Sequence, residues 1–425
     1  MLLASGVLVL SHHPDEAPGA PVAAKPLSKP CLVANGRPPS SGPTALKMAV
    51  EATPFQGVVP NVTVGPDPDW ATYDGENGYV YVPNAFTNVS VINGTSVVDT
   101  VIVGVDANAA VWDSENGYVY VTNEYSGNVS VISGRAIVGS VNVGASPVYA
   151  AYDSGNGDVY VTNYLSNNVS VIHGTELVGS VNVENSPSYA VYDSGNGDVY
   201  VTNSFSANVS VINGTSVIAS VAVGSGPQGA VYDPSNGYVY VPNVNSGSVS
   251  VIGGTSVVGT VAVGQYPSFA TYDGGDGYVY VANAGPNNVS VIHGTQVVAT
   301  VTLESSPSSA VYDSGNGYVY VLEAFSGNVS VVNGTTVIAT VPVGAGPQDA
   351  AYDSGDGYVY VPNSLSGNVS VIGAVSPHHT TVSSTGPGTP WWLYGLNAAV
   401  LGAIIAGVLV YVMRRRRRPA SAFDF

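Results

Sequence analysis

A unit of about 40 residues recurs eight times in this chain of 425 residues and restricts its fold more than any other feature. Each copy holds a Tyr-Asp or Trp-Asp dipeptide; the first interval between these dipeptides is 39 residues and every later interval is 40. The dipeptides end at Asp74, Asp113, Asp153, Asp193, Asp233, Asp273, Asp313 and Asp353. Such a period is typical of repeat architectures in which each copy forms one supersecondary unit.

Every copy carries four short segments with the composition of β-strands, which we name A, B, C and D in chain order. Strand A has the form PxxAxYD, strand B reads YVYVTN or a variant, strand C reads NVSVI, and strand D resembles VVGTVAVG. Each segment is rich in β-branched or aromatic residues and is bounded by Gly, Asn, Asp or Pro, which identifies strands. Four strands per copy predict an all-β fold, a β-propeller of four-stranded blades.

The count of strands predicts how the propeller closes. The chain has eight A, eight B and eight C strands, but no D strand follows the last C strand at 368–372. A spare D strand at 58–65 precedes the first A strand. We expect this N-terminal strand to complete the last blade, so that eight blades form a ring without a free sheet edge. A seven-bladed ring would leave one copy without a place.

The motifs resemble those of a known family. YVTN at 160–163 and 200–203, together with NVSVI and SVAVG, is similar to the YVTN-repeat family of β-propellers, which is well represented among archaeal surface-layer and cell-surface proteins. The similarity covers about 58–372, with variants such as YVPN at 240–243 and YVLE at 320–323. It implies a propeller on a cell surface, and it does not imply one molecular activity.

The charge of the chain restricts its partners. The part before the C-terminal arginine run has 5 basic and 27 acidic residues, a net charge of −22. A nucleic acid would be repelled by this charge, whereas cations and neutral sugars remain acceptable ligands. Cys31 is the only cysteine, so no intrachain disulfide can form and stability must come from packing and hydrogen bonds.

The C-terminal region predicts a membrane anchor. Residues 391–413 contain no charged side chain and are long enough to cross a hydrocarbon core of about 30 Å as a helix. Five arginines at 414–418 follow directly, and such clusters stay on the cytoplasmic side. We therefore expect a single-pass membrane protein with an extracellular propeller and a short cytoplasmic tail at 414–425.

The remaining segments are assigned from composition. Residues 1–11 form a candidate signal segment, although they lack a basic n-region. Residues 12–54 are rich in Pro and Ala and predict a flexible segment before the propeller, which we place at 55–373. Residues 374–390 are rich in Ser, Thr and Pro and predict a stalk.

The repeat predicts two different faces. Antiparallel order places the D–A and B–C loops on one face and the A–B and C–D turns on the other. The turns are nearly the same in every copy, whereas the loops differ, including Phe86, Tyr125, Tyr164, Phe205 and Phe325 in the B–C loops. We call these the variable face and the uniform face. Recognition usually depends on such loops, and the last C strand ends at the uniform face, so the variable face should point away from the membrane.

The start of strand A supplies the candidate ligand-binding residues. Two positions there vary between copies, and we expect the side chains to surround the mouth of the central channel. The candidates are Asp69, Trp70, Tyr149, Tyr189, Gln228, Phe269, Gln348 and Asp349. Aromatic rings beside amides and carboxylates suit sugar recognition. The alternative is that the rings only fill the wide channel of an eight-bladed ring.

Catalytic and metal-binding patterns are weak. His173 and His293 occupy C–D turn positions, and the other four histidines lie outside the repeats, so we expect no catalytic site, metal site or cofactor. Turns such as 153–158 resemble calcium loops in their oxygen atoms, but Asp and Asn followed by Gly are also what a tight turn needs. We favour the turn, and we expect the Asp of Tyr-Asp to cap it.

N-glycosylation sequons are frequent. They begin at Asn61, Asn88, Asn93, Asn128, Asn168, Asn208, Asn213, Asn288, Asn328, Asn333 and Asn368. Most belong to the repeated NVS, where the Asn can be present for its turn, but we expect several exposed ones to be modified in an exported chain.

Three functions remain open at this point. The first is envelope architecture or adhesion through contacts with cell-surface proteins or glycans, with self-association as a further mode. The second is an extracellular receptor for a small ligand or carbohydrate. The third, which we favour least, is a propeller enzyme such as a lyase or hydrolase.

Overall fold

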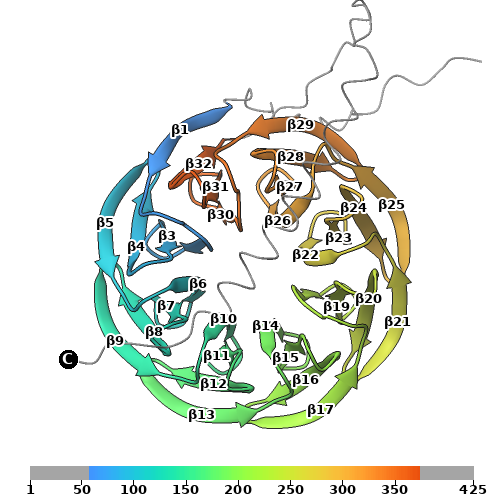
Figure 1. The fold of residues 1–425 in the computed structure, drawn as a ribbon, viewed down its shortest axis with the longest axis horizontal. Coiled ribbons are helices and arrows are strands. Elements are labelled where there is room, and N and C mark those ends of the chain that lie inside the picture. The colour runs from blue at the N-terminus through green and yellow to red at the C-terminus, as the bar shows by residue number, and fades with distance from the viewer. Residues whose placement is uncertain (1–56, 374–425) are drawn as a thin grey trace, which may run out of the picture. The chain divides into compact units, whose positions relative to one another are not determined.

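Eight four-stranded antiparallel sheets stand around a common axis in the computed structural model, which describes residues 57–373 (Figure 1). The predicted eight-bladed β-propeller with four-stranded blades is confirmed. The predicted signal segment, lead-in, stalk, membrane helix and tail lie outside the described residues, at 1–11, 12–54, 374–390, 391–413 and 414–425. Within 57–373, no helix is long and apolar enough to cross a membrane.

The inner strands of the blades are the A and B strands. The A strands are β2 (Thr72–Asp74), β6 (Ala107–Asp113), β10 (Pro147–Asp153), β14 (Pro187–Asp193), β18 (Val231–Asp233), β22 (Pro267–Asp273), β26 (Pro307–Asp313) and β30 (Ala351–Asp353). The B strands are β3 (Tyr79–Asn84), β7 (Tyr118–Asn123), β11 (Asp158–Asn163), β15 (Asp198–Asn203), β19 (Tyr238–Asn243), β23 (Tyr278–Asn283), β27 (Tyr318–Glu323) and β31 (Tyr358–Asn363).

The outer strands are the C and D strands. The C strands are β4 (Asn88–Asn93), β8 (Asn128–Ser133), β12 (Asn168–His173), β16 (Asn208–Asn213), β20 (Ser248–Gly253), β24 (Asn288–His293), β28 (Asn328–Asn333) and β32 (Asn368–Ile372). The D strands are β5 (Ser96–Ile102), β9 (Ala136–Asn142), β13 (Glu176–Asn182), β17 (Ser216–Ala222), β21 (Ser256–Ala262), β25 (Gln296–Thr302), β29 (Thr336–Pro342) and β1 (Val58–Thr63). Blade 1 is β2–β5, and blade 8 is β30, β31, β32 and β1.

The ring closes through its N-terminal strand. Strand β1 pairs antiparallel with β32, with Val62 opposite Val369. Both valines are buried in a cluster that also holds Val80 and Ile92 of blade 1. The Tyr360 hydroxyl of blade 8 donates to a backbone carbonyl in the first C–D turn of blade 1 at 3.0 Å. The predicted closure by a D strand from the N-terminus is therefore confirmed (Figure 1).

The core lies between neighbouring blades and not inside any one of them. Each of the eight interfaces has its own apolar cluster; the cluster between blades 2 and 3, for example, joins Tyr120 and Val131 to Val159 and Val161. A sheet with neighbours on both faces can have apolar side chains on both, which explains why the B strands are buried almost throughout. The Tyr at the third position of strand B is fully buried in every blade.

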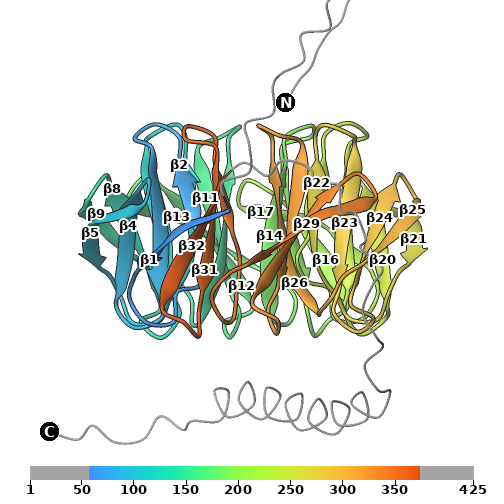
Figure 2. The ribbon, with the colours of Figure 1, turned by 90° about the horizontal axis from the view of Figure 1, so that it is seen from above.

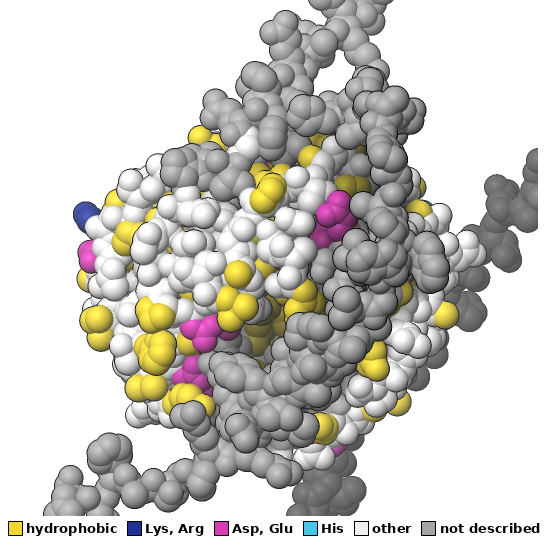
Figure 3. Space-filling model, turned by 45° about the horizontal axis from the view of Figure 1, so that its top comes forward, with side chains coloured by type: hydrophobic (Ala, Val, Ile, Leu, Met, Phe, Trp, Pro, Cys, Tyr) yellow, Lys and Arg dark blue, Asp and Glu magenta, His cyan; other side chains and the backbone are white. Residues whose placement is uncertain are grey.

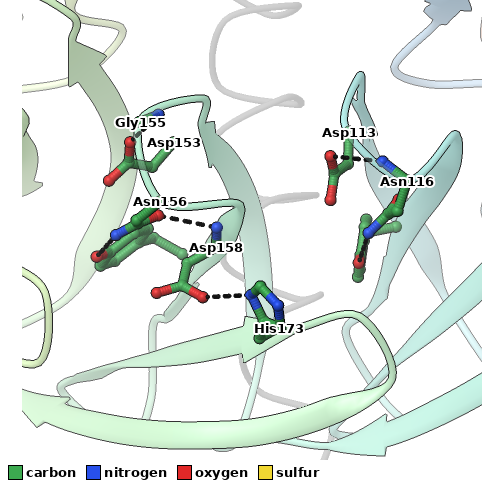
Figure 4. A network of polar contacts seen from close by, with 9 residues as sticks. Asp113, Asn116, Asp153, Gly155, Asn156, Asp158 and His173 are labelled. Atoms are coloured by element: carbon green, nitrogen blue, oxygen red, sulfur yellow. Dashed lines mark hydrogen bonds and ion pairs between the residues drawn. The ribbon is translucent and has the colours of Figure 1, made fainter.

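The Tyr-Asp dipeptide joins the A–B turn to the neighbouring blade at six of the eight blade interfaces. Asp153 caps its own turn by accepting a hydrogen bond from the Gly155 backbone N–H at 2.8 Å (Figure 4). The carboxylate also hydrogen-bonds the Tyr192 side chain of the next blade. The prediction that this Asp caps its turn is confirmed, and its bond to the Tyr of the next blade explains why Tyr and Asp occur together in seven of the eight copies, the exception being Trp112.

Proline in strand B determines the length of strand A. Strands β2, β18 and β30 have three residues, whereas the other five A strands have seven. The three short strands pair with the three B strands that read YVPN, which contain Pro83, Pro242 and Pro362. Proline has no N–H to donate to strand A, so the ladder is interrupted at that level.

Candidate functional site

The variable residues of strand A lie at the variable-face end of the channel, where the ladder is irregular in every blade. In β10, the register with strand B shifts between Pro147 and Tyr149, and a similar shift occurs in the other four long A strands. In the three YVPN blades, only isolated bridges such as Pro68 to Asn84 remain. Bulges re-aim side chains, and here they place one side chain per blade toward the channel.

The Thr of YVTN holds the bulge in place. The hydroxyl of Thr162 donates to the carbonyl of Tyr149 at 3.4 Å, and Thr122 makes the corresponding bond to Ala109 at 3.3 Å. In YVPN blades, which lack this Thr, the proline carbonyl bonds to strand A instead: the Pro362 carbonyl accepts from the Gln348 N–H at 3.0 Å. The B strand therefore fixes how each channel residue is presented.

Four of the predicted residues come together as an aromatic cluster, formed by Trp70, Tyr149, Tyr189 and Phe269. The Tyr149 and Tyr189 rings stack with centroids 3.9 Å apart, and Trp70 meets Tyr149 edge-on at 5.2 Å. The centroids of Trp70, Tyr189 and Phe269 form a triangle with sides of 6.2–6.4 Å. The cluster joins blades 1, 3, 4 and 6, so the rings meet across the channel and not only along its wall.

The small residues at the same level explain how the cluster fits. One residue per blade occupies this level: Trp70, Ala109, Tyr149, Tyr189, Gly229, Phe269, Ser309 and Asp349. A side chain added at Gly229 would come within 2.6 Å of the Ser268 carbonyl oxygen and within 3.1 Å of the Phe269 ring, so the glycine lets the backbone and the ring of the next blade approach closely. The aromatic side of the ring of residues faces a polar side made of Ser309 and Asp349.

Asp349 is the acidic member of this level. The Ser309 hydroxyl donates to its carboxylate with Oγ and Oδ1 2.5 Å apart. Burial raises the pKa of Asp349 to about 7, because the low-dielectric surroundings disfavour the charged form. Its negative charge acts on Tyr149 and Tyr189, whose pKa values are raised mainly by burial, so both phenols stay neutral.

The other three predicted ligand-binding residues lie outside this cluster. Gln348 donates from its amide to the Ser364 hydroxyl of the B–C loop at 3.1 Å. The side chain of Gln228 is exposed, and Asp69 donates its backbone N–H to the carbonyl of Pro83 at 3.0 Å. The Gln348 side chain thus belongs to the loop region around the mouth, whereas those of Ser188 and Ser308 bond to carbonyls of strand B.

A second set of functional candidates lies in the B–C loops. Six blades place a large apolar side chain at the second loop position with exposed fractions of 61–80%: Phe86, Tyr125, Leu165, Phe205, Phe325 and Leu365. In blade 6 that position is Gly285, and the exposed Tyr266 ring from the D–A loop lies beside it. We call Tyr266 and the six residues above the loop ring, which lies on the variable face. Figure 2 shows the propeller from the side, with the strands running between its two faces.

The loop ring differs from the sequence-based prediction at one point. Tyr164 is among the variable B–C loop residues, but unlike Phe86, Tyr125, Phe205 and Phe325 its side chain is half-buried, with its ring 6.3 Å from that of Phe205. Leu165 takes the outward position instead. The reason is position in the loop, because Tyr164 stands at the first loop position and the other four at the second.

Acidic side chains far outnumber basic ones among the described residues. They contain 24 acidic residues and one basic residue, Arg135, which lies in a C–D turn. Figure 3 shows one face, on which most of the described surface is uncharged or apolar. No basic side chain of the described residues is therefore available at the channel mouth to compensate Asp349.

The uniform face carries the histidines and the turns. His173 bonds Asp158 with Nδ1 and Oδ1 3.0 Å apart, and the Asn156 side chain accepts from the Asp158 N–H (Figure 4). The turn oxygens thus bind backbone and side-chain donors of the protein. Between residues 57 and 373, no three His, Cys, Asp or Glu side chains gather as a metal-ligand set.

The sequon asparagines fall into two groups. Asn61, Asn93, Asn213 and Asn333 are exposed. The NVS asparagines are half-buried: Asn88, Asn128, Asn168, Asn208, Asn288, Asn328 and Asn368. Asn168 shows their structural role, because its Oδ1 accepts from Asn163 at 2.8 Å and its amide donates to Ser180 at 3.2 Å.

Comparison with known proteins supports the fold. No protein-family model and no curated protein sequence matches the chain. The C-terminal WD40 domain of Sif2 is 10% identical with a TM-score of 0.64, covering 76% of this chain and 99% of that domain. The fold of the present chain is therefore shared with known β-propellers.

Two enzymes are among the other similar structures. Dihydro-heme d1 dehydrogenase NirN is 14% identical with a TM-score of 0.56, covering 72% of this chain and 75% of that one. Virginiamycin B lyase from Staphylococcus aureus is 13% identical with a TM-score of 0.54, covering 63% of this chain and 95% of the lyase. At these identities, the similarity of this propeller to each of them shows the fold alone.

Proposed function

We propose that this propeller is a non-enzymatic cell-surface protein of envelope architecture or adhesion, which contacts partner proteins or glycans through its variable face. The loop ring is the observation that carries the proposal. Apolar side chains exposed singly are ordinary, but here the same loop position is apolar and exposed in six blades. Aromatic and aliphatic anchors surrounded by polar loops are typical of binding surfaces.

The surface location is supported by the sequence. The uncharged segment at 391–413 and the arginines after it favour a single membrane span with the propeller outside. The similarity of the repeats to the YVTN family, including its archaeal surface-layer members, favours the same location. The end of β32 at the uniform face would then direct the loop ring away from the membrane.

Binding is favoured over catalysis by the position of the reactive side chains. His173 and His293 lie at C–D turns, at the opposite face from Asp349 and the aromatic cluster. General acid–base and nucleophilic catalysis need such groups within hydrogen-bond reach of each other. We therefore propose that the chain is not an enzyme.

A pair of matched triple variants tests the proposal. Cells displaying the full chain are assayed for adhesion to one another and to immobilised glycans. The variant Phe86→Ser/Phe205→Ser/Phe325→Ser should abolish adhesion. The control Val138→Ser/Val178→Ser/Val258→Ser removes apolar side chains that are also exposed, by 45–49%, but on the outer strands. If adhesion were lost only in the control variant, the contact, and any self-association, would lie on the outer strands. That result would overturn the proposal.

The aromatic cluster favours a second candidate, an extracellular receptor for a small ligand or carbohydrate. Trp70, Tyr149, Tyr189 and Phe269 keep part of their surfaces accessible at the channel mouth. Binding of the full chain to a glycan array that disappears in Trp70→Ala and Tyr149→Ala, but not in the loop-ring variant, would favour this candidate.

Glycosylation is proposed at the exposed sequons. Asn93, Asn213 and Asn333 begin C–D turns and Asn61 lies on β1, so a glycan there would meet solvent. The NVS asparagines are half-buried and use their side chains inside the fold, as Asn168 does. In the exposed group, Asn61 accepts from the Ser370 hydroxyl and Asn213 donates to Asp198, so Asn93 and Asn333 are the sites expected to be modified first. Mass spectrometry of peptides from the native chain should find glycans at the first group in preference to the second.

A further inference from the structure

The channel mouth combines aromatic rings with a carboxylate that has no cationic partner among residues 57–373. Trp70, Tyr189 and Phe269 form a triangle of rings with sides of 6.2–6.4 Å. A cation seated over this triangle would lie within about 6 Å of three ring centroids at once, the range in which cation–π attraction operates. Rings that only filled the channel would have no need of an acid beside them.

The acid beside the rings is Asp349. Its hydrogen-bond partners are the Ser309 hydroxyl and the Ala350 backbone N–H, and both are neutral. Taking a carboxylate out of water without a counter-charge is costly, and the cost falls when a cation comes within a few ångströms. Arg135, the one basic residue among those described, is in a C–D turn on the other face.

The polar groups at this level are too few to recognise a sugar well. Ser309 is bonded to Asp349, and the hydroxyls of Tyr149 and Tyr189 bond to each other. Of the neighbouring side chains, Ser188, Ser308 and Gln348 bond to the B strands and B–C loops, whereas Gln228 is exposed and the buried Ser268 hydroxyl has no partner. A polyhydroxyl ligand would find few donors here, whereas a cation needs only ring faces and one negative charge.

We propose that the variable-face end of the channel binds a small organic cation, an alkylammonium or quaternary ammonium group, between the triangle of rings and the Asp349 carboxylate. The propeller's 24 acidic residues against one basic residue attract cations toward the mouth. This site is separate from the loop ring, so it does not depend on the adhesive function proposed above.

Calorimetric titration of the full chain with choline tests the site, using 3,3-dimethylbutanol as the uncharged isostere. At about pH 8.5, where Asp349 is charged, choline should bind and the alcohol should bind at least tenfold more weakly. Absence of heat from choline at millimolar concentration, or equal affinity for the two probes, would overturn the proposal.

Asp349→Asn keeps the shape of the side chain and removes its charge. It should weaken choline at least tenfold, whereas Asp99→Asn on the exposed part of β5 should leave the affinity unchanged. Thermal unfolding of both variants shows whether each is folded. Unchanged choline binding in a folded Asp349→Asn protein would contradict the proposal.

A pH series on the unmodified chain provides a measurement that needs no variant. Choline affinity should fall at least tenfold between about pH 8.5 and pH 5.5 as Asp349 is protonated. The titratable groups on which Asp349 acts are Tyr149 and Tyr189, whose pKa values are raised by burial, so that both phenols stay neutral over this range. The D–A and B–C loops of the same face also carry Asp67, Asp69, Asp106, Glu124, Glu184 and Glu304. An affinity that does not change over the series would contradict the role of Asp349.

Discussion

The two faces of the propeller are built from the same repeat but keep different residues. On the uniform face, each Asp caps its turn, and six of the eight also bond to the Tyr side chain of the next blade, so the residue is determined by geometry, as for Asp153 with Gly155 and Tyr192. On the variable face, the channel position holds Trp70 in one blade and Gly229 or Asp349 in others. The comparison indicates that one face maintains the ring and the other is free to acquire a ligand.

The largest expected effect comes from the buried scaffold near the uniform face. Tyr200 is fully buried, and its hydroxyl donates to the carbonyl of Gly254 in the next blade at 2.9 Å. Tyr200→Ala should lower the free energy of unfolding by about 3–5 kcal/mol, because it leaves a cavity and an unpaired carbonyl. Denaturant unfolding measures this.

A matched control lies in the same blade. Phe205 is also aromatic but is 69% exposed on the variable face. Phe205→Ala should change the free energy of unfolding by less than about 0.5 kcal/mol. Similar losses in Tyr200→Ala and Phe205→Ala would remove the distinction between the faces.

The next effect concerns pH and Asp349. Its carboxyl pKa is raised to about 7 in the folded chain, so the native state holds this proton more tightly than the unfolded state does. The resulting stability is fully present below the unfolded pKa and is lost as the pH rises through 7, by at most about 4 kcal/mol. Unfolding midpoints measured between about pH 4 and pH 8 should fall more steeply in the unmodified chain than in Asp349→Asn. Parallel curves would contradict this.

A smaller effect tests how strand B presents the channel residue. Thr162→Pro converts YVTN to YVPN in blade 3 and should shorten β10 to the three residues seen in β2, β18 and β30. We expect a loss of about 1–3 kcal/mol, since the N–H of residue 162 is removed and the Thr162 hydroxyl no longer bonds to Tyr149. Hydrogen exchange at the Tyr149 and Ala150 amides measures the change.

The reverse substitution provides the control for that experiment. Pro242→Thr in blade 5 restores an N–H and should slow exchange in the segment before β18. If Thr162→Pro left exchange near Tyr149 unchanged, proline would not be the cause of the short A strands.

The smallest effect is expected on the loop ring. Leu365 has an exposed fraction of 80%, so Leu365→Ser should alter the free energy of unfolding by less than about 0.5 kcal/mol. Adhesion of cells displaying this variant should nevertheless decrease. A large loss of stability would show that Leu365 is part of the scaffold.

Most of the fold could be predicted from the sequence because the repeat determines both the strands of each blade and the number of blades. Strand identity follows from segments such as 118–123, and the spare strand at 58–63 follows from a count. The level of the channel residues was predicted from the variable positions of strand A. These inferences needed only the antiparallel order of the strands and the turn residues between them.

The remaining parts required the structure. The consequence of Pro83 for strand A depends on a ladder hydrogen bond between two strands, which no single segment reveals. The exposure of Leu165 in place of Tyr164 depends on one step within a loop. The contact of Ser309 with Asp349 joins residues 40 positions apart on neighbouring blades, and only the packing of blade 7 against blade 8 brings them together.

Both faces exist only if the eight blades close through β1 and β32, and a disulfide tests this directly. Val62 and Val369 are partners in the ladder, so cysteines there should lie at a distance that a disulfide can span. In a Cys31→Ser background, Val62→Cys/Val369→Cys should oxidise fully, and digestion followed by mass spectrometry should find the two strands in one linked peptide. Two thiols that stay free and reactive in the folded double variant would contradict the closed ring.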